Sequence, residues 1–310
     1  LSSDKKIWAV VQSELQEIDE KFGDKRRTKI KTIELAEYNP EDFIEYEDAY
    51  LVISKNGWLR KFKTVVEPNT LKYKENDSLL ATVKANTREF VAFFTSRGMV
   101  YVFKLYNLPY TRTGFGEPIQ NLFKFSDGEK VVSVLSLDPA ELAATTKLLT
   151  GKTSKKPSRQ TRLSFADGEN SGLEGMIVGS SGYGFRFTLT SLIETTRSGR
   201  KLMTLKSDDK LVGFSLVTGD HLFMASISGK GIVIPVEQVA LLTGAGMGSR
   251  LMKMTNSSLA GFKVVNKNDH STITLEDEKI KRINIKDIRV TNRGGQGVII
   301  SKRKKITAIE

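Results

Sequence analysis

Four loops of the chain combine glycine with arginine in a pattern that favours contact with phosphate. They are residues 112–116 (Arg-Thr-Gly-Phe-Gly), 197–201 (Arg-Ser-Gly-Arg-Lys), 244–250 (Gly-Ala-Gly-Met-Gly-Ser-Arg) and 292–297 (Asn-Arg-Gly-Gly-Gln-Gly). Glycine allows a backbone to approach a phosphate closely and to present its N–H groups, and the planar guanidinium of arginine can hold two phosphate oxygens at once. We therefore expect these loops to meet a polyanion.

A tight connection between strands is the simpler interpretation of any single loop of this kind, because glycine also eases a turn. Repetition in four places, each with arginine within or beside the glycines, favours phosphate binding instead. The corresponding stretch of the first repeat, residues 68–74 (Pro-Asn-Thr-Leu-Lys-Tyr-Lys), has no glycine and departs from the pattern. The pattern supplies no helix that could read base edges in a major groove, so we expect little sequence specificity.

A tight turn precedes each loop by about 13 to 15 residues. The turns are centred on Gly57, Gly98, Gly182 and Gly229, between runs of alternating apolar residues, and a weaker copy without glycine spans residues 276–283. This pattern predicts hairpins, in which glycine accepts a positive φ at little cost. The turns lie 41 residues apart from Gly57 to Gly98 and 47 from Gly182 to Gly229, a period typical of propeller blades.

The repeats predict an all-β, propeller-like disc of about five blades, preceded by one α-helix. The five repeat units span residues 49–83, 90–137, 175–217, 221–265 and 271–309. Residues 138–174 break the period, with a short helix expected at 140–149 and then a stretch, 151–162, that holds five basic residues and no acidic one. A degenerate sixth blade is the alternative for this segment, but it lacks alternating strands, so we interpret it as an insertion.

The residues ahead of the blades have a different character. Apolar residues recur at helical spacing from Ile7 to Phe22, which predicts one amphipathic helix over residues 4–22. Ser2 or Ser3 can cap this helix, and Gly23 is expected to end it. A basic turn (24–28), a lead-in strand near 29–35 and an acidic linker as far as residue 48 are expected to follow.

The charge of the chain is large and unevenly divided. The 48 Lys and Arg residues outnumber the 36 Asp and Glu residues, which gives a net charge of +12. Residues 1–50 hold 8 basic and 13 acidic residues, a net of −5, so the rest of the chain carries +17. This basic, β-rich body favours nucleic acid over a membrane surface as partner. Lysine that serves only solubility is the alternative explanation of the charge.

Several classes of site are not expected. The chain has no cysteine, which excludes disulfides, thiolate metal sites and a cysteine nucleophile, and indicates a reducing compartment. His221 and His270 have no neighbours at the spacing of a zinc site or a catalytic triad, so we expect no metal site and no catalytic residue. No apolar run approaches the roughly 20 residues of a membrane span. Because the chain begins at Leu1, we expect it to be a piece of a longer polypeptide.

Several segments together resemble one family. They are residues 22–28 (Phe-Gly-Asp-Lys-Arg-Arg-Thr), 54–60 (Ser-Lys-Asn-Gly-Trp-Leu-Arg), 71–78 (Leu-Lys-Tyr-Lys-Glu-Asn-Asp-Ser), 112–118 (Arg-Thr-Gly-Phe-Gly-Glu-Pro) and 182–185 (Gly-Tyr-Gly-Phe). The chain is similar, from end to end, to the C-terminal region of the A subunit of bacterial type IIA topoisomerases, with residues 138–174 as the main departure. The resemblance implies a β-pinwheel, a propeller-like disc whose blades exchange outer strands with their neighbours. It also implies that residues 1–28 end the coiled coil of the enzyme's cleavage core and that residues 29–48 are a linker.

The resemblance implies a function for residues 49–310: binding and bending of double-stranded DNA along a basic edge. In gyrase, one branch of the family, a Gln-Arg-Arg-Gly-Gly-x-Gly box in the first blade is needed to wrap DNA. The first-blade loop of this chain, residues 64–74, lacks this box, and the nearest match is residues 292–297 in the last blade. We therefore favour the other branch, DNA topoisomerase IV, whose whole enzyme decatenates and relaxes DNA, and gyrase is the alternative.

The family also implies partners and a location. The resemblance places this chain in a heterotetramer with an ATPase B subunit, in which ATP and Mg²⁺ bind outside the segment that this chain resembles, and which acts in the bacterial cytoplasm on the nucleoid. The cations expected to contact DNA are Arg60, Lys61, Lys63, Lys72, Lys74, Arg97, Arg112, Arg186, Arg197, Arg200, Lys201, Lys230, Arg250, Lys253, Arg293, Lys302, Arg303, Lys304 and Lys305. A protein-interaction propeller with incidental charge is the alternative from another class.

Overall fold

The computed structural model describes residues 3–24, 28, 44–150 and 172–309, and the chain divides into two compact units, Leu1–Asp42 and Phe43–Glu310. In the first unit, helix α1 (Asp4–Phe22) has the predicted bounds, and the N–H of Gly23 donates to the carbonyl of Asp19 at its end. None of its residues is buried, and its apolar side chains are exposed except that of Val11, which is half-buried. The expected strand near 29–35 and most of the linker lie outside the described residues. No described helix is long and apolar enough to cross a membrane.

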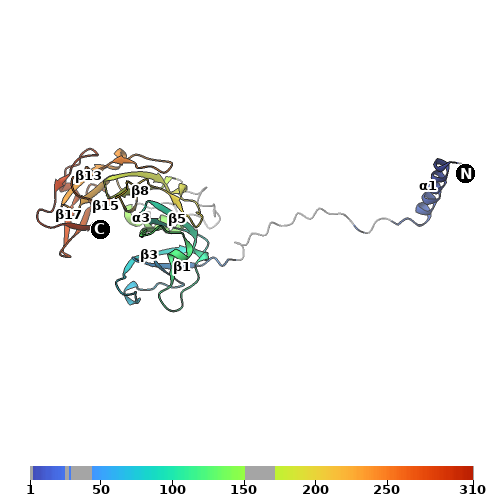
Figure 1. Ribbon diagram of the computed structural model, residues 1–310, viewed down its shortest axis with the longest axis horizontal. Helices are drawn as coiled ribbons and strands as arrows, with labels where there is room; N and C mark the ends of the chain where they lie inside the picture. Colours follow the sequence, from blue (N-terminus) through green and yellow to red (C-terminus); the bar gives the residue numbers. More distant parts are fainter. Residues whose placement is uncertain (1–2, 25–27, 29–43, 151–171, 310) are drawn as a thin grey trace. The chain divides into compact units, whose positions relative to one another are not determined.

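The described residues of the second unit form five antiparallel sheets, which confirms the predicted five blades (Figure 1). The first sheet contains β1 (Asp48–Ser54), β2 (Trp58–Phe62), β3 (Leu79–Asn86) and β6 (Glu117–Pro118), and the second contains β4 (Phe90–Thr95), β5 (Met99–Lys104), β7 (Val131–Ser136) and β10 (Arg200–Lys201). The third contains β8 (Glu174–Gly179), β9 (Tyr183–Thr188), β11 (Leu211–Leu216) and β14 (Ser249–Arg250), and the fourth contains β12 (His221–Ser226), β13 (Lys230–Pro235), β15 (Leu259–Val265) and β18 (Val298–Ile299). The fifth contains β16 (His270–Leu275), β17 (Ile280–Asn284) and β19 (Ile306–Ile309). Short helical turns α2 (Ile119–Leu122), η2 (Pro68–Thr70), η3 (Leu105–Asn107), η5 (Leu189–Ser191), η6 (Val236–Gln238) and η7 (Ile285–Asp287) connect the strands.

A hairpin forms the centre of each sheet, as the turns predicted. In the first, β1 pairs with β2 around Gly57, whose φ is 84°. The other three turn glycines also have positive φ values, and Glu278, with φ of 61°, takes the same place in the fifth turn. Each hairpin therefore turns within a few residues and leaves its second strand at the outer side of the sheet.

The outermost strand of each of the first four sheets comes from the next unit along the chain. Strand β6 pairs with β2, β10 with β5, β14 with β9 and β18 with β13, each time at the two residues that follow the turn glycine. This confirms the exchange of strands between neighbouring blades. In the first unit, Pro68–Thr70 form the turn η2 and residues 71–74 form no strand, and no described segment donates a strand to the fifth sheet. Among the described strands, the exchange is thus an open series.

The hydrophobic core lies between successive sheets, so a central strand is buried on both faces. On β4, Phe93 packs toward the first sheet and Phe94 toward the third, where it stacks on Phe214 with ring centroids 4.5 Å apart. On the inner side, β3, β7, β11, β15 and β19 contact one another in turn. Burial on both faces removes the usual alternation of exposed and buried residues along a strand.

The insertion begins with the predicted helix, α3 (Pro139–Thr150). Leu142 packs into the core between the second and third sheets, and the carboxylate of Glu141 pairs with Lys84 at 2.9 Å. The basic stretch 151–162 lies outside the described residues. In the part of the chain that the structure describes, no sixth sheet occurs.

Candidate nucleic-acid interface

The predicted glycine–arginine loops belong to the segments that reach across to the preceding sheet. We call these the exchange segments: residues 111–119, 195–202, 242–251 and 291–300. The first is held at both ends, where the N–H of Thr111 donates to the carbonyl of Lys61 (2.8 Å) and the N–H of Ile119 to that of Gly57 (2.9 Å). The other three make equivalent bonds to their own preceding sheets. The loops therefore occupy equivalent places on the outer edges of four successive sheets.

The glycines of an exchange segment have two different surroundings. A Cβ on Gly116, whose φ is +87°, would lie 2.0 Å from the carbonyl oxygen of Leu59, so only glycine allows this segment to reach the first sheet. A Cβ on Gly114 would meet nothing within 4 Å, and the same is true of Gly244. Some of these glycines therefore serve strand exchange, whereas the sequence pattern had led us to expect that all of them would serve phosphate contact. The open glycines keep an accessible backbone.

The outer edge of the third sheet brings two cations to one aromatic ring. Arg250 on β14 pairs with Tyr183 on β9, and its guanidinium donates to the Tyr183 hydroxyl at 3.1 and 2.8 Å. The ammonium of Lys206 lies 5.0 Å from the centroid of the same ring. Sequence reasoning missed Tyr183 and Lys206 as site residues. A sequence signal for Tyr183 was available, because an aromatic residue follows the turn glycine directly both at Tyr183 and at Trp58.

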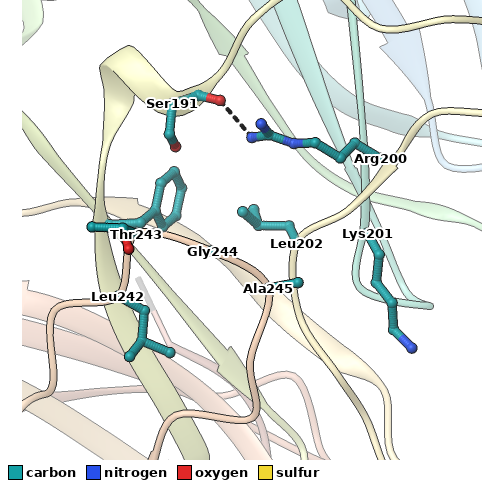
Figure 2. Close-up of a pocket in the computed structure, with 9 residues that line it drawn as sticks. Ser191, Arg200, Lys201, Leu202, Leu242, Thr243, Gly244 and Ala245 are labelled. Carbon is teal, nitrogen blue, oxygen red and sulfur yellow. Dashed lines mark hydrogen bonds between the residues drawn. The ribbon is translucent and has the colours of Figure 1, made fainter.

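A hollow of about 230 Å³ lies beside the edge of the second sheet (Figure 2). Arg200 donates from its guanidinium to the carbonyl of Ser191, while Lys201 is exposed and extends away from the other lining residues (Figure 2). Gly244 and Ala245 of the next exchange segment line the hollow as well. The two adjacent cations of β10 therefore have different surroundings, and Lys201 is the one that solvent reaches.

The first edge carries its cations on loops, because β6 itself contributes the acidic Glu117. The ammonium of Lys74 lies 3.6 Å from the ring centroid of Trp58 and 5.7 Å from that of Phe115. Arg112, on the same exchange segment as Phe115, is exposed. An aromatic ring beside a lysine thus occurs at the first edge as at the third.

The prediction that Arg60 and Lys61 contact DNA is wrong, because both side chains are buried. Arg60 is 5% exposed, and its guanidinium donates to the carbonyl of Lys72. Lys61 is 3% exposed, and its ammonium donates to the carbonyls of Leu105 and Leu108, both at 3.0 Å. Burial lowers the pKa of Lys61 to about 8, although the charge of Glu47 opposes the change. Arg60 thus holds a loop of its own unit and Lys61 stabilises the junction with the second unit, and neither cation can reach a phosphate.

The other candidates fall into three groups. Four are half-buried: Arg186 (bonded to Glu174 and to the carbonyl of Val239), Arg200, Lys230 and Lys304 (bonded to Asp277). Five are exposed but interact with another group of the chain: Lys63 with Glu47, Lys74 with Trp58, Arg97 with the carbonyl of Asp127, Arg197 with the carbonyls of Asn121 and Leu122, and Arg250 with Tyr183. Eight are exposed, with no side-chain hydrogen bond or ion pair to the rest of the described chain: Lys72, Arg112, Lys201, Lys253, Arg293, Lys302, Arg303 and Lys305.

Metal-binding side chains do not gather in the described ranges. Among those residues, no group of three or more His, Asp or Glu side chains is arranged to hold a metal ion. The candidate site is therefore a set of cations, aromatic rings and open loops along the outer sheet edges.

A family model described as DNA gyrase C-terminal domain, beta-propeller, matches residues 89–138, 176–218, 220–266 and 276–306. These ranges cover more than half of the chain and correspond to units two to five. The first unit, whose loop lacks glycine, lies outside them.

Curated relatives and one solved structure agree with that match. The chain is 25% identical to the DNA gyrase A subunit of Dehalogenimonas lykanthroporepellens over 97% of its own length and 42% of the relative. It is 26% identical to the DNA gyrase A subunit of Salmonella typhimurium over 95% of its length and 37% of the relative. The chain thus spans less than half the length of these relatives. The structure of the E. coli ParC C-terminal domain shares the fold, with a TM-score of 0.64, 22% identity, and coverage of 85% of this chain and 98% of that one.

Proposed function

The chain belongs to the DNA gyrase C-terminal domain family, and from that membership we propose that residues 43–310 bind double-stranded DNA along the outer sheet edges. One observation carries the proposal: strand exchange repeats an equivalent loop at four successive edges, and cations such as Arg112, Lys201, Arg250 and Arg293 are exposed there. A duplex that follows these edges would meet one cluster of cations after another. No helix of the described chain is placed to read bases, so binding would be independent of sequence.

Bending follows from the curvature of the edge. Bending a 20–30 bp segment of DNA costs roughly 1–6 kcal/mol, which exceeds the contribution of a single phosphate contact. Several edges must therefore act together, and each contact releases condensed counterions from the DNA. The free energy of binding should consequently depend steeply on salt.

We infer a role for the chain within a larger enzyme, the A subunit of a bacterial type IIA topoisomerase. There it would work with the cleavage core and an ATPase B subunit, which supply the sites for Mg²⁺ and ATP, in the cytoplasm and on the nucleoid. Our preferred assignment is topoisomerase IV, because residues 64–74 contain no glycine and no arginine, and η2 occupies the place of a wrapping loop. The whole enzyme would then decatenate and relax DNA.

Gyrase is the second candidate. The relatives reported above carry the name of the gyrase protein, and residues 292–297 offer an Arg-Gly-Gly-x-Gly sequence in the last blade. A plasmid assay separates the two candidates: the chain joined to its core, with ATP and its B subunit, is incubated with relaxed DNA. Negative supercoiling would establish gyrase, whereas decatenation and relaxation without supercoiling supports topoisomerase IV.

Binding itself is tested with the chain alone. Affinity for a 40 bp duplex, measured by fluorescence anisotropy at several salt concentrations, should fall with a log–log slope of about −0.9 per phosphate contacted. Two duplexes of unrelated sequence should bind equally. A slope near zero would eliminate the proposal. Ligation of nicked plasmid circles in the presence of the chain then reports whether the bound DNA is bent with a fixed handedness.

A further inference from the structure

The outer edge of the fifth sheet is not covered by any strand of the described chain. In the first four sheets, the second residue after the turn pairs with the donated strand and is buried: Leu59 and Val100 are 0% exposed, and Gly184 and Gly231 are buried too. Ile280 takes this position on β17 and is 67% exposed. The fifth sheet thus has an acceptor edge like the others, without its donor.

The backbone of this edge shows the same difference. In the first sheet, the carbonyls of Gly57 and Lys61 accept hydrogen bonds from the exchange segment. The corresponding carbonyls of the next three sheets do so as well: Gly98 and Val102, Gly182 and Arg186, and Gly229 and Val233. The equivalent residues of the fifth sheet are Glu278 and Arg282, and within the described residues no neighbouring unit donates to either carbonyl.

The orientation of β17 makes these groups available. The N–H of Leu275 donates to the carbonyl of Lys279, which fixes the alternation of hydrogen bonds along the β16–β17 pair. Alternate residues of an antiparallel strand direct both backbone groups away from the partner strand. The N–H and carbonyl of Ile280 and Arg282 therefore point outward, as those of Leu59 and Lys61 do in the first sheet.

The described chain holds no spare donor for this edge. Each of the four exchange segments is already paired with its preceding sheet. The remaining candidate, residues 68–74, forms η2 and is held to its own blade, where Arg60 donates to the carbonyl of Lys72. Within the described residues, every segment of this kind is therefore already in use.

Charge indicates what kind of segment fits. Arg282, Lys302 and Arg303 are exposed, with no ion pair in the described chain, and Lys279 contacts only Asp277, at 3.9 Å. Asp277 accepts a hydrogen bond from Lys304, while Glu276 and Glu278 of the turn are exposed. The cations Lys281 and Arg282 lie on β17 itself, where side chains of a paired strand would meet them.

We propose that β17 binds an extended, acidic segment of a partner protein by antiparallel strand addition. Main-chain hydrogen bonds to Glu278 and Arg282 would supply affinity, and the surrounding cations would select acidic side chains. The segment would follow the geometry of the exchange segments, with a glycine before the two residues that pair with β17. Lys302 and Arg303 are also among the cations expected to contact DNA, so the experiment compares the peptide with duplex DNA at this edge.

The probe for the test is a fluorescent peptide with the sequence of residues 109–121, which contains the exchange segment that already holds an acidic residue, Glu117, and it carries Arg112→Glu to make it more acidic. The matched control peptide also carries Thr111→Pro and Ile119→Pro, which remove the two N–H donors. Anisotropy with the full chain should show saturable binding of the probe, and binding of the control at least tenfold weaker. Hydrogen exchange should show protection of the Ile280 and Arg282 amides by the probe only.

Two variants of the chain locate the site. Arg282→Pro deletes an outward N–H and leaves the bonds to β16 intact, because proline is tolerated on an edge strand. It should weaken probe binding at least tenfold, while Arg282→Thr, which removes only the charge, should weaken it a few fold. Thermal melts of both variants verify folding.

Four outcomes would overturn the proposal. They are no binding of the probe, equal binding by Arg282→Pro, protection of the same amides by duplex DNA, and protection that rises with chain concentration alone. The third would assign the edge to DNA, and the fourth to a second copy of the chain.

Discussion

Two pairs of adjacent basic residues, Arg60-Lys61 on β2 and Arg200-Lys201 on β10, have opposite roles in the same architecture. On β2, Arg60 donates to the carbonyl of Lys72 in its own unit and Lys61 donates to carbonyls of the second unit, and both cations are buried. Strand β10 is itself the outer edge of its sheet, so Lys201 is exposed. The comparison teaches that the place of a cation in the exchange, and not its sequence pattern, decides whether it stabilises the fold or is available to a ligand.

Charge reversal should separate the two pairs most strongly. Lys61→Glu would place a carboxylate beside the carbonyls of Leu105 and Leu108 and near Glu47, and we expect a loss of about 3–5 kcal/mol in the free energy of unfolding. Lys201→Glu, at an exposed edge, should change it by less than about 0.5 kcal/mol. Urea unfolding of both variants measures the difference. Equal losses would contradict the comparison.

The same distinction between covered and open positions applies to glycine. Gly116→Ala should destabilise the chain by about 3 kcal/mol, because a Cβ adds both a positive-φ penalty and an overlap with the carbonyl of Leu59. Gly114→Ala has the φ penalty alone and should cost about 1 kcal/mol. Thermal and chemical unfolding of the two variants side by side provide the measurement, and a larger loss for Gly114→Ala would refute our assignment of the packed glycine.

Duplex binding should respond to the exposed edge cations only. Together, Lys201→Gln and Arg250→Gln should reduce the magnitude of the salt slope by about 1.8, that is about 0.9 for each lost phosphate contact. Lys267→Gln, an equally exposed residue outside the exchange segments, serves as the control and should leave the slope unchanged. If all three substitutions reduce the slope alike, the binding surface is not the outer edge.

A smaller effect should appear with pH. Burial lowers the pKa of Lys61 from 10.5 to about 8, so between these values the unfolded chain keeps a proton that the folded chain has released. The free energy of unfolding should therefore rise with pH across this range, by at most about 1.4 kcal/mol per pH unit, relative to the Lys61→Met variant. Urea unfolding of both proteins at pH 7.5 and 9.5 tests the sign. A wild-type advantage that shrinks as pH rises would be inconsistent with a buried ammonium.

The sequence allowed the blades to be predicted, because their determinants are local. Four turn glycines, a weaker fifth copy without glycine and the flanking alternation gave the five units to within a few residues. The donated strands have no such signal: β6 is Glu-Pro and β14 is Ser-Arg, and each is a strand only because a neighbouring sheet pairs with it. Strand exchange was expected from the resemblance alone.

The candidate site was less accessible to sequence reasoning, for a physical reason. In the run from Trp58 to Phe62, alternation would expose one face, but the 68–74 segment of the same unit engages Arg60 and the second unit engages Lys61, so both are buried. Tyr183 looked like an ordinary strand residue, because its contact with Arg250 joins positions 67 residues apart. Such contacts depend on which unit donates to which sheet.

Each donated strand pairs with the sheet of the preceding unit, and this direction of exchange has a consequence for synthesis on the ribosome. Each of the first four sheets stays incomplete until its donated strand, roughly 60 to 100 residues further along the chain, has left the exit tunnel. At about 5–20 residues per second, every nascent edge waits seconds for its closing strand. A chain that stops early would present an unsealed edge at its last finished unit, wherever translation halts.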